Sequence, residues 1–192
     1  QEYGADDILI QGKTYIPTHY NANGHPYYII NDFQKSTIYI NDKVYKNQEV
    51  KYNLEIDKFI LKINHNTGTD AYILLNSYYI DSVVIDDICF VNSSLFANFE
   101  SLNGFYEKVY NGSFIFLIKH QKSFKNTYSR STPYGSYSKQ FKNYFLIQDT
   151  DANKQTRYIR PRTDDIEWEL AYMALEAHGF SGFLDDEYTS LK

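Results

Sequence analysis

The sequence predicts a mainly β protein: an antiparallel meander that forms an open sheet, a sandwich or a partial barrel, packed by one C-terminal α-helix. Its 192 residues include 20 tyrosines and 13 phenylalanines, which favour strands as Ile and Val do. Apolar and polar residues alternate in several short runs, with the period of a half-buried strand. The connections between these runs are too short for the crossovers that parallel strands need. The length fits a single domain spanning residues 1–192.

The first half of the chain predicts strands joined at short polar turns. Residues 49–56 alternate most clearly, with Val50, Tyr52, Leu54 and Ile56 on one face. Further strands are expected at residues 7–11, 14–18, 27–30, 37–40, 43–45, 59–63, 71–75, 80–85 and 88–91. The turns between them are expected at Gly12-Lys13, Asn41-Asp42, residues 64–70 and Asp86-Asp87. A helical turn is expected within residues 93–103.

Residues 105–120 predict the hairpin around which the sheet is built. Asn111-Gly112 suits a two-residue turn because both residue types tolerate the positive φ angles that such a turn requires. That register places Tyr110 opposite Ser113, Val109 opposite Phe114 and Phe105 opposite Ile118. The return strand, residues 114–118, is apolar at every position. We therefore expect it to be covered on both faces and to be the central strand of the fold.

The C-terminal part predicts a last hairpin and the one helix. The hairpin is expected to join residues 144–148 and 156–159. The helix is expected at residues 163–178, where Asp164 and Glu167 resemble a capping box. Gly179 suits the position after a helix end, and an acidic tail of residues 179–192 follows.

Charge, hydropathy and cysteine content narrow the kinds of partner and the cellular compartment that we expect. The net charge of −5 argues against a general nucleic-acid binder. No apolar run is long enough to predict a transmembrane segment, and a single cysteine, Cys89, excludes an intrachain disulfide. The chain begins at Gln1, as expected for an exported protein after signal-peptide removal, although a chain shortened for another reason would begin the same way.

Three segments carry a resemblance to a known family. They are residues 50–57 (VKYNLEID), residues 104–112 (GFYEKVYNG) and residues 144–147 (YFLI). With them, residues 15–160 resemble an uncharacterised exported β-rich protein family of Gram-negative gut bacteria. The resemblance implies a mostly β fold and a periplasmic or cell-surface location, and it implies no activity. The helical, acidic C-terminal segment departs from that pattern.

The segment of residues 119–142 is the candidate binding region. Between Lys108 and Gln148 the chain has seven Lys and Arg and no acid, and aromatic residues alternate with the bases. The candidate binding residues are Lys122, Phe124, Lys125, Tyr128, Arg130, Tyr134 and Tyr137. Their rings offer stacking surfaces, and their cations offer charge-assisted bonds to an acidic glycan, a lipid head group or an anionic protein. The alternative is a solvated edge whose aromatic residues are tucked into the core.

Other motifs fall short of a metal or catalytic site. His19 and His25 share one loop without a third ligand, so we expect solvated or turn-capping histidines. Residues 149–153 begin like a calcium loop, but Lys154 and Arg160 stand where its glycine and glutamate belong. Residues 179–182 lack the last glycine of a nucleophile elbow. We expect no metal and no cofactor.

The sequence therefore favours a non-enzymatic, exported protein that binds a partner or belongs to an envelope assembly. A glycan or an envelope protein is the expected partner, and nucleic acid is not. Two alternatives stay open. One is an envelope hydrolase with a pocket that the sequence does not announce, and the other is a structural interaction protein that docks through its C-terminal helix.

Overall fold

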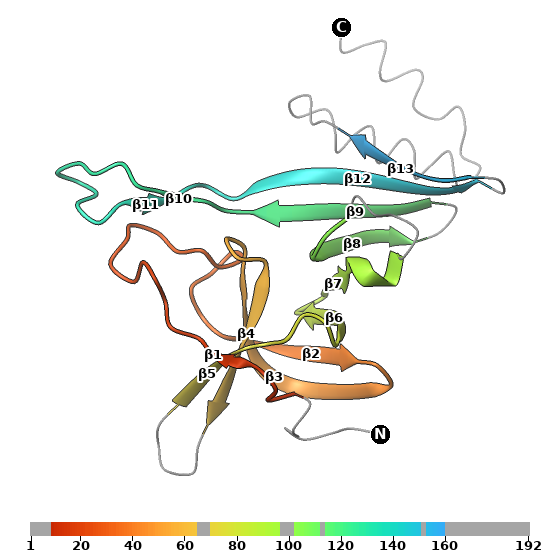
Figure 1. Ribbon diagram of the computed structural model, residues 1–192, viewed down its shortest axis with the longest axis horizontal. Helices are drawn as coiled ribbons and strands as arrows, with labels where there is room; N and C mark the ends of the chain where they lie inside the picture. The colour runs from red at the N-terminus through yellow and green to blue at the C-terminus, as the bar shows by residue number, and fades with distance from the viewer. Residues whose placement is uncertain (1–8, 65–69, 97–101, 112–113, 151–152, 160–192) are drawn as a thin grey trace, which may run out of the picture.

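The computed structural model describes residues 9–64, 70–96, 102–111, 114–150 and 153–159. Within them the first strands are β1 (Lys13–Thr14), β2 (Gln34–Ile40), β3 (Lys43–Asn53), β4 (Lys58–Asn64), β5 (Asp70–Leu74), β6 (Ile80–Ile85) and β7 (Ile88–Asn92). A 3-10 turn η1 (Ser93–Phe96) follows, then β8 (Phe105–Asn111), β9 (Phe114–Gln121), β10 (Phe124–Lys125), β11 (Ser136–Tyr137), β12 (Phe141–Thr150) and β13 (Asn153–Ile159). Figure 1 shows their arrangement.

The described strands form one large antiparallel sheet and one small ribbon. The sheet has the order β1-β5-β4-β3-β2-β6-β7-β8-β9-β12-β13, and the ribbon pairs β10 with β11. Most neighbours are consecutive in the chain, as a meander requires, and the two ends of the sheet do not pair with each other. The prediction of a mainly β, antiparallel meander is thus confirmed, and of the three predicted alternatives the structure has the open sheet.

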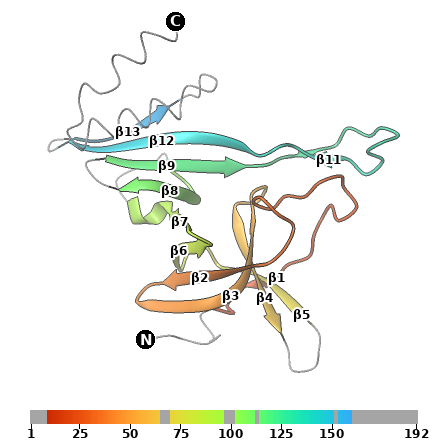
Figure 2. The same cartoon turned by 180° about the vertical axis from the view of Figure 1, so that it is seen from behind.

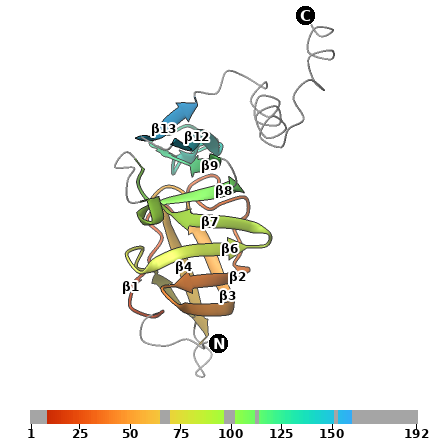
Figure 3. The ribbon, with the colours of Figure 1, turned by 90° about the vertical axis from the view of Figure 1, so that its right-hand side faces the viewer.

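The sheet coils because β3 changes partner along its length. Its first part pairs with β2 and its last residues pair with β4. Figure 3 shows β2, β6, β7 and β8 stacked one above another, with β4 running across them. The ring of Tyr52 in β3 therefore meets Phe90 in β7 at 5.0 Å and Phe105 in β8 at 6.3 Å between centroids.

The concave side of this coil encloses the main core. Tyr52, Phe59, Phe90 and Phe105 are almost completely buried there, with aliphatic residues of β2, β3, β4 and β6. A second core, on the other face of the sheet, contains Val91, Leu102, Tyr106 and Leu117. Strands β7 to β9 are consequently covered on both sides, and Phe116, Leu117 and Ile118 are buried in succession, as predicted.

Two predicted tight turns are confirmed. Ile40 pairs with Lys43 across Asn41-Asp42, and Ile85 pairs with Ile88 across Asp86-Asp87. Asn41 has a φ of 49° and Asp86 a φ of 52°. Asn and Asp adopt this left-handed conformation more readily than other non-glycine residues.

The predicted turn at Gly12-Lys13 is wrong. Residues Lys13 and Thr14 pair with Leu74 and Ile73 of β5, so this segment is an edge of the sheet. Gly12 is needed for close approach: a Cβ there would lie 2.3 Å from the carbonyl oxygen of Leu74. A long-range contact, invisible in the local sequence, decides the role of this glycine.

The central hairpin exists, but its predicted register is wrong. Glu107 pairs with Ile118 and Asn111 with Ile115, and the register shifts between Lys108 and Tyr110. The residue at that shift, Val109, is 51 % exposed, so the bulge turns an apolar side chain outward. Strand β9 is also not central, because only β12 and β13 lie beyond it in the sheet.

Two other predicted strands differ from the structure. The strand predicted at residues 49–56 ends at Asn53, whose side-chain oxygen accepts the N–H groups of Glu55 at 3.0 Å and Ile56 at 3.4 Å and turns the chain. Residues 27–30 form no strand; Tyr27 makes one isolated bridge, to Asn53, and Ile29 has a φ of 54°. The helical turn expected after β7 is the 3-10 turn η1.

The last hairpin is confirmed and is longer than predicted. Its pairing runs from Tyr144 opposite Ile159 to Thr150 opposite Asn153. The predicted helix at residues 163–178 and the tail at 179–192 lie outside the described residues. Of the described chain, no helix has the length and apolar character to cross a membrane.

Candidate functional site

The candidate binding region forms an arm, residues 122–140, that extends β9 and β12 beyond the sheet. Phe124 pairs with Tyr137 and Lys125 with Ser136 in the ribbon β10-β11. Figures 1 and 2 show this arm beside the N-terminal loop, residues 15–33, from both sides. The two segments are bonded directly: the N–H of Asn23 donates to the carbonyl of Gly135 at 3.0 Å, and the N–H of Tyr137 donates to that of Asn23 at 2.9 Å.

Two adjoining hollows lie where the arm meets the loop. The first hollow has a volume of about 280 Å³ and the second about 600 Å³, and they share Thr18, His19 and Tyr20. The first is lined chiefly by Tyr15, His25, Tyr27, Asn31, Phe33, Lys51, Tyr72 and Tyr137. The second is lined by Asn21, Ala22, Phe124, Asn126, Tyr128, Pro133 and Tyr134. Among the residues that the structure describes, no aspartate or glutamate lines either hollow.

The aromatic residues at the base of the arm fasten it to the loop. The rings of His19 and Phe124 stack with centroids 3.7 Å apart, and Tyr137 meets Phe124 edge-on at 5.6 Å. The hydroxyl of Tyr137 donates to Glu55 Oε2 at 3.1 Å. The phenol's burial, followed by the nearby Glu55 carboxylate, raises the pKa of Tyr137 and keeps it protonated.

The structure divides the predicted binding residues into two groups. Lys122 belongs to the anchor with Phe124 and Tyr137, because its ammonium donates to the carbonyls of His25 at 3.2 Å and Tyr27 at 2.7 Å. The exposed group is Lys125, Tyr128, Arg130 and Tyr134, of which the two tyrosines line the second hollow. The alternative of a solvated edge is thus right for some residues, but the anchored rings pack on the loop and not in the core.

Polar contacts in the first hollow were missed from the sequence. The side chain of Asn53 donates to the Tyr15 hydroxyl at 3.1 Å, and the hydroxyls of Tyr15 and Tyr27 lie 3.3 Å apart. Burial, and then the bond from Tyr15, raises the pKa of Tyr27. The phenol of Tyr27 therefore stays protonated, and the hydroxyls of both tyrosines can donate or accept hydrogen bonds. They come from separate segments, and no local pattern joins them.

Lys51 and His25 are two ionisable bases that line the first hollow. The ammonium of Lys51 donates to the carbonyl of Asn31 at 2.9 Å and to its side-chain oxygen at 3.2 Å. It also lies 4.6 Å from the ring centroids of both Tyr27 and Phe33. The N–H of Tyr27 donates to Nδ1 of His25 at 3.2 Å, so the neutral imidazole carries its proton on Nε2. The turn-capping expectation is confirmed for His25.

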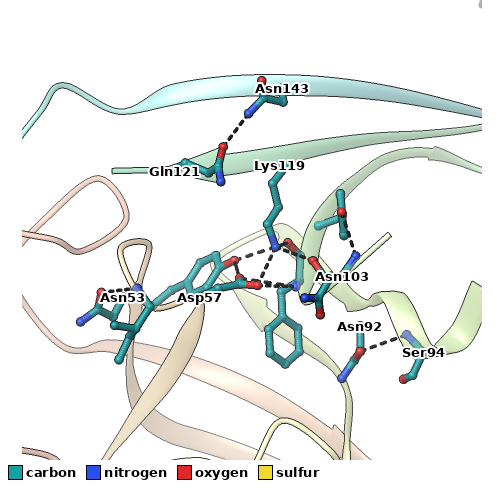
Figure 4. Close-up of polar contacts among 12 residues, drawn as sticks. Asn53, Asp57, Asn92, Ser94, Asn103, Lys119, Gln121 and Asn143 are labelled. Atoms are coloured by element: carbon teal, nitrogen blue, oxygen red, sulfur yellow. Dashed lines mark hydrogen bonds and ion pairs between the residues drawn. The ribbon is translucent and has the colours of Figure 1, made fainter. Parts of the chain in front are cut away.

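A second polar cluster, which we call the latch, lies away from the hollows (Figure 4). Lys119 Nζ donates to Asp57 Oδ2 at 2.6 Å, and the Tyr52 hydroxyl donates to Asp57 Oδ1 at 2.5 Å. Lys119 also donates to the carbonyls of Asn103 at 2.9 Å and Phe105 at 3.0 Å. Lys119 is buried and all three of its N–H groups are used in these bonds, which join β9 and β8 to the β3–β4 turn.

The described residues offer little for catalysis or metal binding. The buried His120 is bonded to Glu107 and to Gln140, and its ring packs against Tyr28 and Phe90, outside both hollows. Within the described ranges, no group of three His, Cys, Asp or Glu side chains could hold a metal ion. The hydrolase alternative calls for convergent carboxylates or histidines in a cleft, and the first hollow contains only His19 and His25 of these.

Comparisons with protein-family models, with curated proteins and with solved structures returned no match for this chain. The family resemblance therefore stays a prediction.

Proposed function

We propose that the protein is an exported, non-enzymatic binding protein that holds a glycan in the two hollows between the arm and the N-terminal loop. The observation that carries the proposal is the lining of these adjoining hollows. Tyrosine rings and protonated phenols from separate segments converge there without an acid. Sugars present apolar C–H faces and many hydroxyls, which match rings with a polar edge. Export is supported by the family resemblance alone.

Exposed residues of the second hollow make the contact surface testable. Tyr128 is 63 % exposed and Tyr134 is 61 % exposed, while Tyr20 between the two hollows is 80 % exposed. Rings in these positions gain burial only when a ligand or partner covers them. Lys125 and Arg130 lie on the same arm and favour a partner with negative charge.

The test is glycan binding by a double variant, Tyr128→Ala with Tyr134→Ala, on an array followed by calorimetry. Each stacking ring contributes on the order of 1 kcal/mol, so the variant is expected to bind about tenfold more weakly or worse. Tyr78→Ala is the matched control, because Tyr78 is 85 % exposed and lines neither hollow. Equal binding by the wild type and the double variant would exclude this surface.

A further inference from the structure

The ammonium of Lys51 lacks a negatively charged partner in the first hollow. Two of its three N–H groups go to Asn31, and aromatic faces flank it. Neither an acceptor for the third N–H nor a carboxylate within ion-pair distance is found among the described residues. Burial lowers the pKa of Lys51, and Asp32, an exposed acid nearby, only partly opposes that shift.

Two other lysines, Lys119 and Lys62, have carboxylate partners. Lys119 is paired with Asp57 at 2.6 Å, and Lys62 lies 3.6 Å from Glu49 and 3.3 Å from Asp70. A half-buried cation without a counter-ion costs free energy that a bound anion would recover. Lys122 also donates to carbonyls and not to a carboxylate, but its acceptors hold the loop to the arm, whereas Lys51 lines a hollow that is open to a ligand.

The surroundings reinforce the positive character of the first hollow. Lys51 and Lys122 both lower the pKa of His25, which shows that the three groups are electrostatically close. The chain as a whole has a net charge of −5, so this concentration of bases runs against the overall balance. Of the acids near the lining, Asp32 is exposed and Glu55 already accepts the Tyr137 hydroxyl.

We propose that Lys51 is the anion-binding group of the site, and that the glycan bound there carries a carboxylate or a sulfate on the sugar that enters the first hollow. This inference rests on the proposed function and specifies its ligand. The anion would accept the third N–H of Lys51, while the phenols of Tyr15 and Tyr27 are placed to bond the sugar hydroxyls.

The test compares an oligogalacturonate with its methyl ester, which has the same backbone without the charge. The wild type is expected to bind the acid at least about tenfold more tightly, as for a charge-assisted hydrogen bond. Lys51→Met keeps a similar side-chain volume and should lose the preference, so that acid and ester bind equally. Lys51→Arg should retain the preference, and Lys62→Met is the control for loss of a lysine elsewhere. Dextran sulfate against dextran makes the same comparison for a sulfate.

The possible outcomes distinguish a failure of the anion-binding role of Lys51 from a failure of the proposed glycan binding. The anion role of Lys51 is overturned, and the glycan function stands, if the wild type prefers neither the acid over its ester nor dextran sulfate over dextran. The same holds if Lys51→Met weakens the charged and the uncharged probes equally. A Lys51-dependent preference for dextran sulfate alone supports the anion role and identifies sulfate as the group. If the wild type binds none of these probes and no glycan on the array, the proposed function itself fails. Thermal unfolding of each variant shows whether a loss of binding reflects a loss of fold.

Discussion

The latch and the first hollow each place a lysine among aromatic rings, but they treat its charge in opposite ways. Lys119 lies 4.6 Å from the ring centroid of Tyr106 and is bonded to the carboxylate of Asp57. Lys51 lies at the same distance from two rings and is bonded only to neutral oxygens. The first charge is neutralised within the fold and has a structural role. The second is left for a ligand.

The ion pair of the latch, Asp57 with Lys119, connects parts of the sheet that are not neighbouring strands. Strands β3 and β8 are separated by three strands in the sheet, and the coil brings the β3–β4 turn against the start of β8. Asp57 accepts there from Tyr52 and Lys119 and from the N–H of Phe105. Gly104, with a φ of 79°, is required beside it, because a Cβ would lie 1.6 Å from Asp57 Oδ2. Side chains, and not backbone pairing, hold the coil closed at this point.

Breaking the latch is the change with the largest expected effect. Asp57→Asn keeps a residue that tolerates the φ of 54° at this position, but it leaves Lys119 buried without a counter-charge. We expect a loss of about 3–5 kcal/mol in the free energy of unfolding, measured by urea denaturation.

The double variant Asp57→Asn with Lys119→Met is the control for the latch. It removes the unpaired ammonium, so at least half of the lost stability should return. A loss below about 1 kcal/mol in Asp57→Asn would show that the ion pair is not needed to hold the coil.

Lys122 is an intermediate case that sharpens the comparison. Its ammonium also has no carboxylate partner in the part of the chain that the structure describes. Its two carbonyl acceptors belong to the N-terminal loop, so the side chain holds the loop to the arm. Lys122→Met should cost about 1.5–3 kcal/mol of unfolding free energy, because charge-assisted bonds are lost at a half-buried site. Lys125→Met, at an exposed neighbouring position, should stay within about 0.5 kcal/mol of the wild type. Equal effects would contradict the division of the arm into anchor and exposed residues.

Local signals predicted much of the fold, and long-range contacts decided the rest. The turns at Asn41 and Asp86 depend on the conformational preferences of those residues, so the sequence could reveal them. Gly12 has the same local appearance, but its conformation depends on β5, some sixty residues away. The hairpin of β8 and β9 was likewise predicted, while the bulge at Val109 that shifts its register was not.

The candidate site also combines features that the local sequence predicts with features that depend on long-range contacts. The basic and aromatic composition of the arm indicated a binding region, and two of its tyrosines do line a hollow. The alternation at residues 49–56 predicts for Lys51 only a place on the polar face of a strand, opposite Val50 and Tyr52. Its role depends on Asn31, Tyr27 and Phe33, which the N-terminal loop brings over that strand. No spacing in the sequence encodes that approach.

The smallest predicted effect is a pH dependence in which stability and affinity change in opposite directions. Burial, and then Lys122 and Lys51, hold the pKa of His25 below its ordinary value of about 6.5. At a pH between the lowered pKa of His25 in the folded protein and its ordinary pKa in the unfolded chain, the unfolded chain binds a proton at His25 and the folded protein does not. The stability of the free protein therefore falls as the pH drops through this window and is constant again below the folded pKa.

A bound anion would offset the positive charges of Lys51 and Lys122 and so raise the pKa of His25. The complex would then bind a proton at His25 at a pH where the free protein does not. Affinity for oligogalacturonate should then rise as the pH falls from about 7.5 to about 5, by less than about tenfold, while the galacturonate carboxyls stay ionised. Calorimetry across this range would measure the change, and His25→Gln should abolish it without removing the preference for acid over ester. If affinity instead falls together with stability, the charge that governs binding is not at Lys51 and His25. The latch and the first hollow would then differ in their architecture, but the lysine of the first hollow would be no more available to a ligand than the lysine of the latch.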